Sequence, residues 1–414
     1  MTMVQAPPRA RGSATIRGAA KRENRIAFTA SVRNRLGPFT ITQLVAIELA
    51  AVAVGATLGR PLPFLIGGGA VAFLLLLAVF TPSGGRLLYQ SVPMRRRLKA
   101  RRKAALQVRD DNLLEQLTPD ISISRVEDRD AIIGVARDGA GWFAALAMGG
   151  PDGIGAPVPF ERLTRLFTEA GAPVSAIQVI AHTVPVGVAI QGSPAAQSYQ
   201  ELLGGTAAVV HQTSWLAVRL DLGDAADAAV NRGGGVEGVH KSLAVTVSRI
   251  GKALRNAGVT HRVLDDDGLR AALKQSLALT TISPTANPRT NETWKSWQAG
   301  GLEHITHRIR SWPSDMATLP RVLDEVAAVP AAFTTVSVTI SPGPVSRRAP
   351  DGAALERRIE VRGLVRLSCD PNSSAMVCGR LREAAAQVGT RLSRLDGEHG
   401  PAAYASAPTG GGPR

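Results

Sequence analysis

The sequence has little cysteine and no compact catalytic motif, and both absences reduce the number of functions that the protein can have. Its two cysteines, Cys369 and Cys378, lie nine positions apart without a CxxC pair or a nearby histidine pair. This spacing argues against a disulfide scaffold and a zinc site. We expect free thiols in a reducing compartment. No H-E-x-x-H motif and no nucleophile turn with Ser, His and Asp is present, so we expect no catalytic residues, no cofactor and no metal.

Acidic residues are scarce in the first quarter of the chain. Residues 1–109 contain 18 Lys or Arg but only Glu23 and Glu48 as acids. The remaining 30 basic and 31 acidic residues leave the rest of the chain near neutral. A nucleic-acid-binding domain normally carries a basic face on its folded part. We therefore expect no nucleic-acid partner.

Two long apolar runs follow the basic N-terminal arm. They cover residues 40–58 and 62–80, and each approaches the roughly 20 residues needed to cross about 30 Å of hydrocarbon. Only Gly59, Arg60 and Pro61 separate them, which is a tight turn. The runs predict a transmembrane hairpin. A buried helical hairpin in a soluble protein is the alternative, but core hairpins seldom carry two nearly charge-free runs of this length.

Basic residues flank the predicted hairpin on both sides. They are Arg9, Arg11, Arg17, Lys21, Arg22, Arg25, Arg33 and Arg35 before it, and Arg86, Arg95, Arg96, Arg97, Lys99, Arg101, Arg102 and Lys103 after it. By the positive-inside rule, both chain ends are cytoplasmic and the protein is a multi-pass inner-membrane protein. The cluster at 95–103 is interpreted either as a helix near anionic headgroups or as a topology signal only.

Glu48 lies in the middle of the first predicted span. Ionisable groups at that depth are costly and usually face protein. A proton relay would need further intramembrane titratable groups, so we favour packing of Glu48 against a helix of another subunit over a transport role. Small residues favour close helix packing. The glycines predicted to do this are Gly55 and Gly59 for the first span, and Gly67, Gly68 and Gly69 for the second.

From about residue 110, short β-like runs alternate with amphipathic helices. We therefore predict a mixed α/β domain of two or more layers over residues 110–397. The predicted organisation is a basic arm at 1–39, the hairpin at 40–80, a basic linker at 81–109, this cytoplasmic domain, and a disordered tail at 398–414. We find no repeat period, which argues against a solenoid.

The predicted strands are 121–126, 131–137, 142–148, 174–183, 214–222, 262–264, 302–312, 334–340 and 356–368. The predicted helices are 160–170, 195–203, 238–256, 268–279, 314–328 and 373–388.

Three motifs in the domain are candidates for binding a nucleotide or a metal ion. The glycines Gly233–Gly235 precede a helix, but without the Gly-Lys-Ser pattern a flexible turn or partner-contact loop is favoured over a nucleotide loop. The acids Asp265–Asp267 could hold a divalent metal, but a helix N-cap is favoured. His304 and His307 lie three apart in a predicted strand, so they face opposite sides and do not suit one metal.

Several segments resemble the EccE family, a membrane component of the actinobacterial type VII (ESX) secretion system. The segments are Tyr89-Gln90 with Pro93, Gly141-Trp142-Phe143-Ala144, residues 178–185, Arg232-Gly233-Gly234-Gly235, residues 292–297 and Gly300-Gly301-Leu302. The resemblance implies an accessory, non-enzymatic subunit at the periphery of the secretion pore, alongside EccB, EccC, EccD and the mycosin protease, in contact with anionic lipids.

Two other functions stay open at the level of the sequence. One is a membrane-tethered, glycosyltransferase-like enzyme that uses Asp265 and Asp267. The other is a lipid-sensing regulatory protein, which rests on the basic cluster at 95–103.

Overall fold

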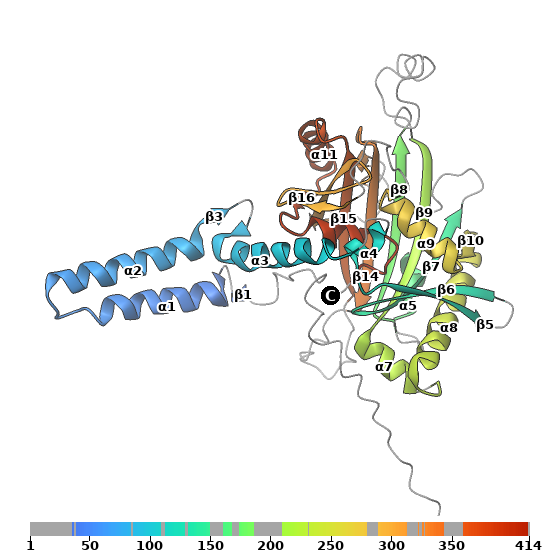
Figure 1. Ribbon diagram of the computed structural model, residues 1–414, viewed down its shortest axis with the longest axis horizontal. Helices are drawn as coiled ribbons and strands as arrows, with labels where there is room; N and C mark the ends of the chain where they lie inside the picture. Colours follow the sequence, from blue (N-terminus) through green and yellow to red (C-terminus); the bar gives the residue numbers. More distant parts are fainter. Residues whose placement is uncertain are drawn as a thin grey trace, which may run out of the picture.

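The computed structural model describes residues 35–36, 39–83, 86–108, 112–128, 131–149, 160–167, 174–185, 209–230, 232–279, 289–312, 322, 325–326, 328–342 and 359–412. Within these ranges the chain forms a helical arm and a domain built on one large sheet, from which the arm projects (Figure 1).

The arm consists of three helices, α1 (Ile41–Gly55), α2 (Leu62–Phe80) and α3 (Leu88–Ala105). α1 and α2 lie side by side, and α3 continues from α2 to the sheet domain (Figure 1). Two short strand pairs accompany these helices. β1 (Arg35–Leu36) pairs with β2 (Phe39–Thr40) just before α1, and β3 (Pro82–Ser83) pairs with β4 (Arg86–Leu87) between α2 and α3. α2 begins directly after Pro61 and has Pro63 in its first turn, where proline costs no hydrogen bond.

The domain is a twelve-stranded sheet in which every pair of neighbours is antiparallel. Its first six strands are β5 (Ser122–Asp128), β6 (Ala131–Asp138), β7 (Gly141–Gly149), β8 (Ala176–Pro185), β9 (Val209–Asp221) and β10 (Thr260–Val263). The other six are β11 (Asn291–Glu292), β12 (Trp297–Ala299), β13 (Leu302–Ser311), β14 (Phe333–Pro342), β15 (Ile359–Cys369) and β16 (Arg391–Arg394). This confirms a mixed α/β domain.

Seven described helices accompany the sheet. They are α4 (Leu113–Leu117), α5 (Phe160–Arg165), α7 (Leu222–Val230), α8 (Gly235–Arg255), α9 (Asp266–Ser276), α11 (Ser374–Gln387) and α12 (His399–Ser406). Most strands and helices expected from the sequence appear within a few residues of their expected bounds. The helix expected at 195–203 and most of the one expected at 314–328 lie outside the described residues.

The two sets of six strands have the same topology. In the first, the order is β5-β6-β7-β9-β8 with β10 also on β7; in the second, it is β11-β12-β13-β15-β14 with β16 also on β13. The sets meet where β8 pairs with β14. The sequence shows no repeat period, but the structure contains an internal repeat, which differing loop lengths and divergent side chains conceal in the sequence.

Hydrogen bonds at matching places support this repeat. The amide of Leu264 donates to Ala145 O at 3.1 Å in the first set, and the amide of Leu395 donates to Thr306 O at 3.0 Å in the second. Ala145 and Gln178 pair with the same residue of β9, Ala217. In the same way, Thr306 and Thr335 pair with the same residue of β15, Arg366. Gln178 then pairs with Thr339, and Thr335 pairs with His182. The two sets are therefore related by a pseudo-two-fold axis through the pair Ile180–Ser337.

The helices that precede β10 and β16 also end alike. Gly258 after α8 has φ +75, and Gly389 after α11 has φ +69. The next amides, of Val259 and Thr390, reach back to carbonyls five residues earlier at 2.9 and 2.8 Å. Glycine suits both positions because a left-handed residue ends a helix without a Cβ clash.

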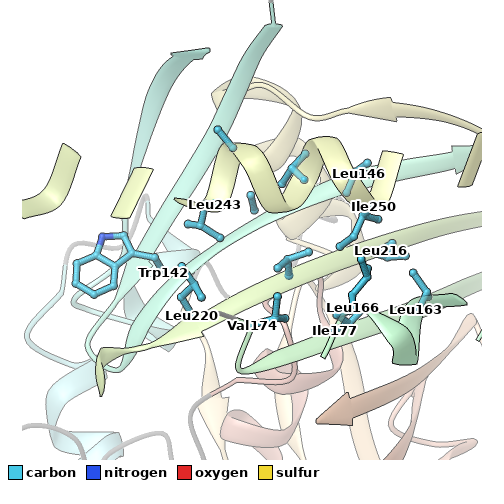
Figure 2. Close-up of a cluster of buried hydrophobic side chains, with 14 of the residues drawn as sticks. Trp142, Leu146, Leu163, Leu166, Val174, Ile177, Leu216, Leu220, Leu243 and Ile250 are labelled. Atoms are coloured by element: carbon cyan, nitrogen blue, oxygen red, sulfur yellow. The ribbon is translucent and has the colours of Figure 1, made fainter. Parts of the chain in front are cut away.

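One face of the first half-sheet packs against α5 and α8. α8 is amphipathic: Val239, Leu243, Val247, Ile250 and Leu254 recur at helical spacing and are buried. Figure 2 shows Leu243 and Ile250 of α8 pointing to strand side chains such as Leu146 and Leu216. On the second half-sheet, α11 covers a corresponding cluster around Val365 and Leu367.

The other sheet face packs against α4, α9 and α12. On the central strands this face is polar, and the C-terminal residues bury it. The side-chain amide of Gln178 donates to Ser337 Oγ at 2.6 Å and to Ala405 O at 2.7 Å, while its oxygen accepts the Gly411 amide at 2.8 Å. The Tyr404 hydroxyl donates to Asp138 at 2.9 Å.

The disordered tail expected at 398–414 is therefore wrong for residues 398–412, which are buried. Their Gly-, Ala- and Pro-rich sequence has no amphipathic period because they lie inside the domain, with protein on all sides. The domain expected to end at 397 continues through this segment.

Candidate functional site: the apolar helices and the docked basic helix

The surfaces of α1 and α2 are apolar and uncovered. Within the described ranges one helix, α2, is long and apolar enough to cross a bilayer, whereas α1 has 15 residues and falls short of the same length. Leu62, Ile66 and Phe73 of α2 are each more than 60% exposed, and Val52 of α1 is 65% exposed. Contiguous apolar exposure of this kind is unfavourable in water and requires another apolar surface.

The glycines expected to pack helices divide into three groups. A Cβ on Gly68 would lie 2.7 Å from Thr57 Cγ2 and 2.9 Å from Ala53 O, so Gly68 permits the close approach of α2 to α1. Gly55, Gly67 and Gly69 have no atom within 4 Å of that position. Gly59 lies in the turn after α1 with φ +82, so its expected place on a helical packing face is wrong.

Glu48 lies on α1 with an exposed side chain. The contact expected for it, with a helix of another subunit, stays a prediction.

α3 docks on the sheet domain through its basic residues. Arg101 Nε and Nη2 donate to the two carboxylate oxygens of Glu292, each at 2.8 Å, and Nη2 also donates to Gly397 O at 2.6 Å. Arg102 Nε donates to Glu292 O. Arg95 stacks over the Trp294 ring at 5.3 Å from its centroid. Bidentate pairs of this geometry are the strongest ion pairs available to arginine.

The docking site is closely packed around one glycine. Gly397 has φ +78, and a Cβ there would lie 2.6 Å from the Trp294 ring and 3.0 Å from Met94 Cγ. Met94 and Leu98 are buried. The Glu292 carboxylate also accepts the Gly400 amide at 3.0 Å, which ties α3 to the start of α12.

Some residues of the basic cluster at 95–103 therefore contact the domain, and others are exposed to solvent. Arg95, Arg101 and Arg102 contact the domain, whereas Arg96, Lys99 and Lys103 are exposed. Arg97 is half-buried and has an interaction partner. Sequence reasoning assigned all seven to lipid or topology and missed Glu292 and Gly397 as their protein partners. The acidic and aromatic residues of the Glu292-Thr293-Trp294 motif were the sequence signal that could have predicted a partner for this basic helix.

A comparison with protein-family models bears on the segment that forms this docking site. The model described as "Putative type VII ESX secretion system translocon, EccE" matches residues 208–309, which are 102 of the 414 residues. The chain carries an EccE region. No curated protein matches the chain. The EccE region extends from β9 into β13, so it includes Glu292 and Trp294 and confirms the resemblance noted in the sequence.

The first of the three aspartates at 265–267, in the EccE region, caps a helix. Asp265 Oδ1 accepts the Gly268 amide at 2.8 Å at the start of α9. Asp267 is exposed beside Arg270 at 3.6 Å, and Asp266 lies 4.0 Å from Arg125. Among the described residues, no group of three or more His, Cys, Asp or Glu side chains could hold a metal ion. The capping interpretation of Asp265 is confirmed.

The glycine loop of the EccE region joins two helices. It follows α7 rather than a strand, and Gly233, Gly234 and Gly235 all have positive φ. Lys241 lies in α8, six residues after its first residue, and pairs with Glu237 at 2.7 Å on the exposed surface. A nucleotide loop needs a preceding strand and a lysine directed at the phosphates. The geometry fits the expected turn.

The histidines of β13 are both buried, and their neighbours differ. His304 Nδ1 hydrogen-bonds Ser368 Oγ at 2.7 Å, and its ring lies 4.8 Å from Trp297. Burial, with smaller contributions from the nearby His399 and Arg394, lowers the pKa of His307 to about 3. Both cysteines are free and buried, and burial raises the pKa of Cys369 to about 12.

Proposed function

We propose that the chain is an accessory, non-enzymatic subunit of the inner-membrane type VII (ESX) secretion complex. In this proposal α1 and α2 lie in the membrane as a two-helix anchor, and the sheet domain stands on the cytoplasmic side at the periphery of the pore. The observation that carries it is the EccE region itself, residues 208–309, attached through α3 to apolar helices whose surfaces are uncovered.

The membrane placement is supported by the distribution of charge and apolar surface. The exposed side chains of α2 are almost entirely apolar, while α3 directly after it is basic. A basic segment beside a span is typical of the cytoplasmic side. Arg96, Lys99 and Lys103 are exposed and free to face anionic headgroups, at about 1 kcal/mol each near the surface.

The docking of α3 gives the anchor a structural role. A bidentate ion pair, a ring contact and two buried apolar side chains hold α3 against β11 and the loop that follows it. The domain is thereby held in one orientation relative to α3, instead of being tethered by a flexible linker. Such an arrangement suits a scaffold, whose partners require a defined position.

Proposed partners are the remaining components of the secretion machinery: EccB, EccC, EccD and the mycosin protease. Extraction of the complex from actinobacterial membranes in mild detergent tests this. The affinity tag belongs at the N-terminus, because residues 399–412 are buried. We expect co-migration with a very large complex on native gels. Recovery as a lone monomer, or in the high-speed supernatant without detergent, contradicts the proposal.

Glu48 supplies a sharper version of the same test. Its carboxyl is exposed on an otherwise apolar helix surface, so we propose that it contacts another subunit. Glu48→Leu is expected to lower the yield of the large complex. Val45→Leu, at an exposed apolar position of the same helix, is the matched control. Equal yields for both variants contradict this role.

The topology is tested with a reporter enzyme inserted after position 110. Activity only on the cytoplasmic side is expected, and activity outside the membrane would overturn the proposed orientation.

A further inference from the structure

The two ends of the large sheet differ in what covers them. At one end, α3 contacts β11: Arg102 Nε donates to Glu292 O, and Arg101 binds the Glu292 carboxylate. At the other end, β5 is the last strand and pairs with β6 alone among the described residues. Ile123 of β5 occupies the place that Glu292 has in the second repeat. The edge that α3 covers in the second half is therefore uncovered, within the described ranges, in the first half.

The strand register shows which backbone groups of β5 point to this open edge. The Gly134 amide of β6 donates to Leu264 O of β10 at 2.8 Å, so the polar groups of Gly134 point away from β5. Arg125 lies directly opposite Gly134. In an antiparallel pair, the N–H and C=O groups of opposite residues point either toward each other or both outward. Those of Arg125, and by alternation those of Ile123 and Glu127, therefore point outward.

This row of backbone groups is suited to the addition of a strand. None of the outward N–H and C=O groups of Ile123, Arg125 and Glu127 has a backbone partner in the part of the chain that the structure describes. β5 is seven residues long and has neither a proline nor a register shift, the usual devices that protect an edge. It lies on the side of the domain opposite to α1 and α2 (Figure 1), where a water-soluble partner can reach it.

The side chains along the open edge specify what kind of strand fits. Ile123 is half-buried, whereas the side chains of Arg125 and Glu127 are 52% and 77% exposed. Arg125 lies 4.0 Å from Glu127 and 4.0 Å from Asp266. Ion pairs of this length on an exposed surface contribute little, so both charges of β5 are available to a partner.

An added strand runs antiparallel to β5, as β6 does, and places its side chains directly opposite those of the open row. A basic residue then lies opposite Glu127, an acidic residue opposite Arg125 and an apolar residue opposite Ile123. The complementary segment, read from its N-terminal end, has the order basic, any, acidic, any, apolar.

We propose that β5 is a docking edge for an extended segment of a partner protein that carries this order of residues. The segment exchanges backbone hydrogen bonds with Ile123, Arg125 and Glu127, and its two charged side chains fix its direction and register. This mode of recognition obtains affinity from the main chain and specificity from alternate side chains. The inference does not depend on the secretion function, and the experiment below does not measure secretion.

The test is fluorescence anisotropy of labelled peptides with the full chain in nanodiscs of neutral lipid. The probe is the capped peptide Thr-Lys-Thr-Glu-Thr-Val-Thr, and the control is Thr-Glu-Thr-Lys-Thr-Val-Thr, which has the same composition and net charge. We expect saturable binding of one probe peptide per chain, about tenfold tighter than the control, because two cross-strand pairs change from attraction to repulsion. No saturable binding up to millimolar concentration, or equal affinity for the two peptides, would overturn the proposal.

Residue-resolved hydrogen exchange locates the bound peptide. The amides of Ile123, Arg125 and Glu127 should gain protection when the probe binds, while those of Ser124 and Val126, which already pair with β6, should change little. Protection of the outward amides in the chain alone would show that the edge is covered without a partner. Displacement of the probe by excess unlabelled chain would identify a second copy as the occupant. Either result contradicts the proposal.

Variants of β5 test the predicted register. Exchange of the two charges, Arg125→Glu with Glu127→Arg, should reverse the preference between the two peptides. The matched control is Glu237→Lys with Lys241→Glu, which exchanges the charges of an exposed pair on α8 and should leave the preference unchanged. A preference that survives the exchange in β5, or that reverses with the exchange in α8, would refute the register.

A second pair of variants tests the main-chain contribution. Glu127→Pro removes an outward N–H without removing a hydrogen bond to β6, so binding of both peptides should be lost. Glu127→Gln keeps the N–H and should weaken binding of the probe by less than about fivefold, the effect of one exposed ion pair. Unchanged binding by Glu127→Pro would show that the peptide does not pair with the edge.

Discussion

Replacement of Glu292 by Gln tests whether α3 is held to the domain by its ion pair. The carboxylate is 9% exposed and the Arg101 side chain 14% exposed. Each carboxylate oxygen accepts one hydrogen bond from Arg101 at 2.8 Å. Gln preserves the volume and one acceptor, which can still receive the Gly400 amide. It removes the charge and the second acceptor.

The expected magnitude follows from these contacts. A hydrogen bond to a charged group contributes about 1.5–3 kcal/mol, and partial exposure places this pair near the lower end of that range. We therefore expect about 2 kcal/mol less free energy for docking of α3, which is about a 30-fold increase in its opening equilibrium. The domain should stay folded, because the core around α8 does not involve Glu292.

Hydrogen exchange of the full chain in nanodiscs measures this effect locally. Amides in residues 98–105 of α3 should lose about 30-fold of their protection, while those in α8 keep theirs. Glu237→Gln is the matched control, because that carboxylate is exposed and pairs only with exposed Lys241. It should change neither helix.

Two results would refute the reasoning. Unchanged exchange in α3 would show that apolar contacts alone hold it, and equal loss of protection in α8 would show general destabilisation. A double-mutant cycle with Arg101→Gln separates the ion pair from the other contacts. If the pair acts as a unit, the double variant lowers the docking free energy of α3 little more than either single variant does.

Three further predictions concern the packing and the buried titratable groups. Tyr404→Phe removes the donor to Asp138 at 2.9 Å and should lower the free energy of unfolding in urea by about 1–2 kcal/mol; no change contradicts the buried network. Gly68→Val should separate α1 from α2 and lower their thermal stability by circular dichroism, whereas Gly67→Val should not. Burial lowers the pKa of His304, His307 and His399, so the unfolded chain takes up protons first as pH falls below about 6.5. The neutral burial of His307 alone should lower the free energy of unfolding by about 1.4 kcal/mol between pH 7.5 and pH 5.5, and His304 and His399 act in the same direction. Thermal unfolding should therefore show the lower stability at pH 5.5, and equal stability at the two pH values would contradict neutral burial.

Regular, one-sided elements could be predicted from the sequence. α8 has apolar residues at helical spacing, and the D-G dipeptide at 138–139 marks the turn between β6 and β7. The helix is readable because it has one buried and one exposed side, and the turn is readable because D-G dipeptides favour tight connections between strands. The docking of α3 was not readable in the same way, because an arginine that pairs with a distant Glu292 looks the same in sequence as one that faces lipid.

The C-terminal segment was misread for a related reason. Gln178, Ser337 and Thr339 put polar side chains on one face of the central strands, and such a face normally faces water. Here it is buried by residues that follow Glu398. Gly411 fits there because a Cβ would lie 2.7 Å from the Thr339 hydroxyl. The small residues that let this segment pack closely on the sheet give it the same composition as a disordered tail.

The internal repeat explains why only one half of the sheet carries a docking site for α3. Glu292 pairs with Trp297 in the second half, and Ile123 pairs with Ala136 at the matching place in the first. The acid that binds Arg101 is thus an apolar residue in the other repeat. The residue two positions after Leu395 is Gly397, whereas the residue two positions after Leu264 is Asp266. A side chain there would occupy the space that the Trp294 ring fills in the second repeat. Two halves with one topology have therefore diverged in their surfaces, so that a single, asymmetric attachment fixes the domain on its arm.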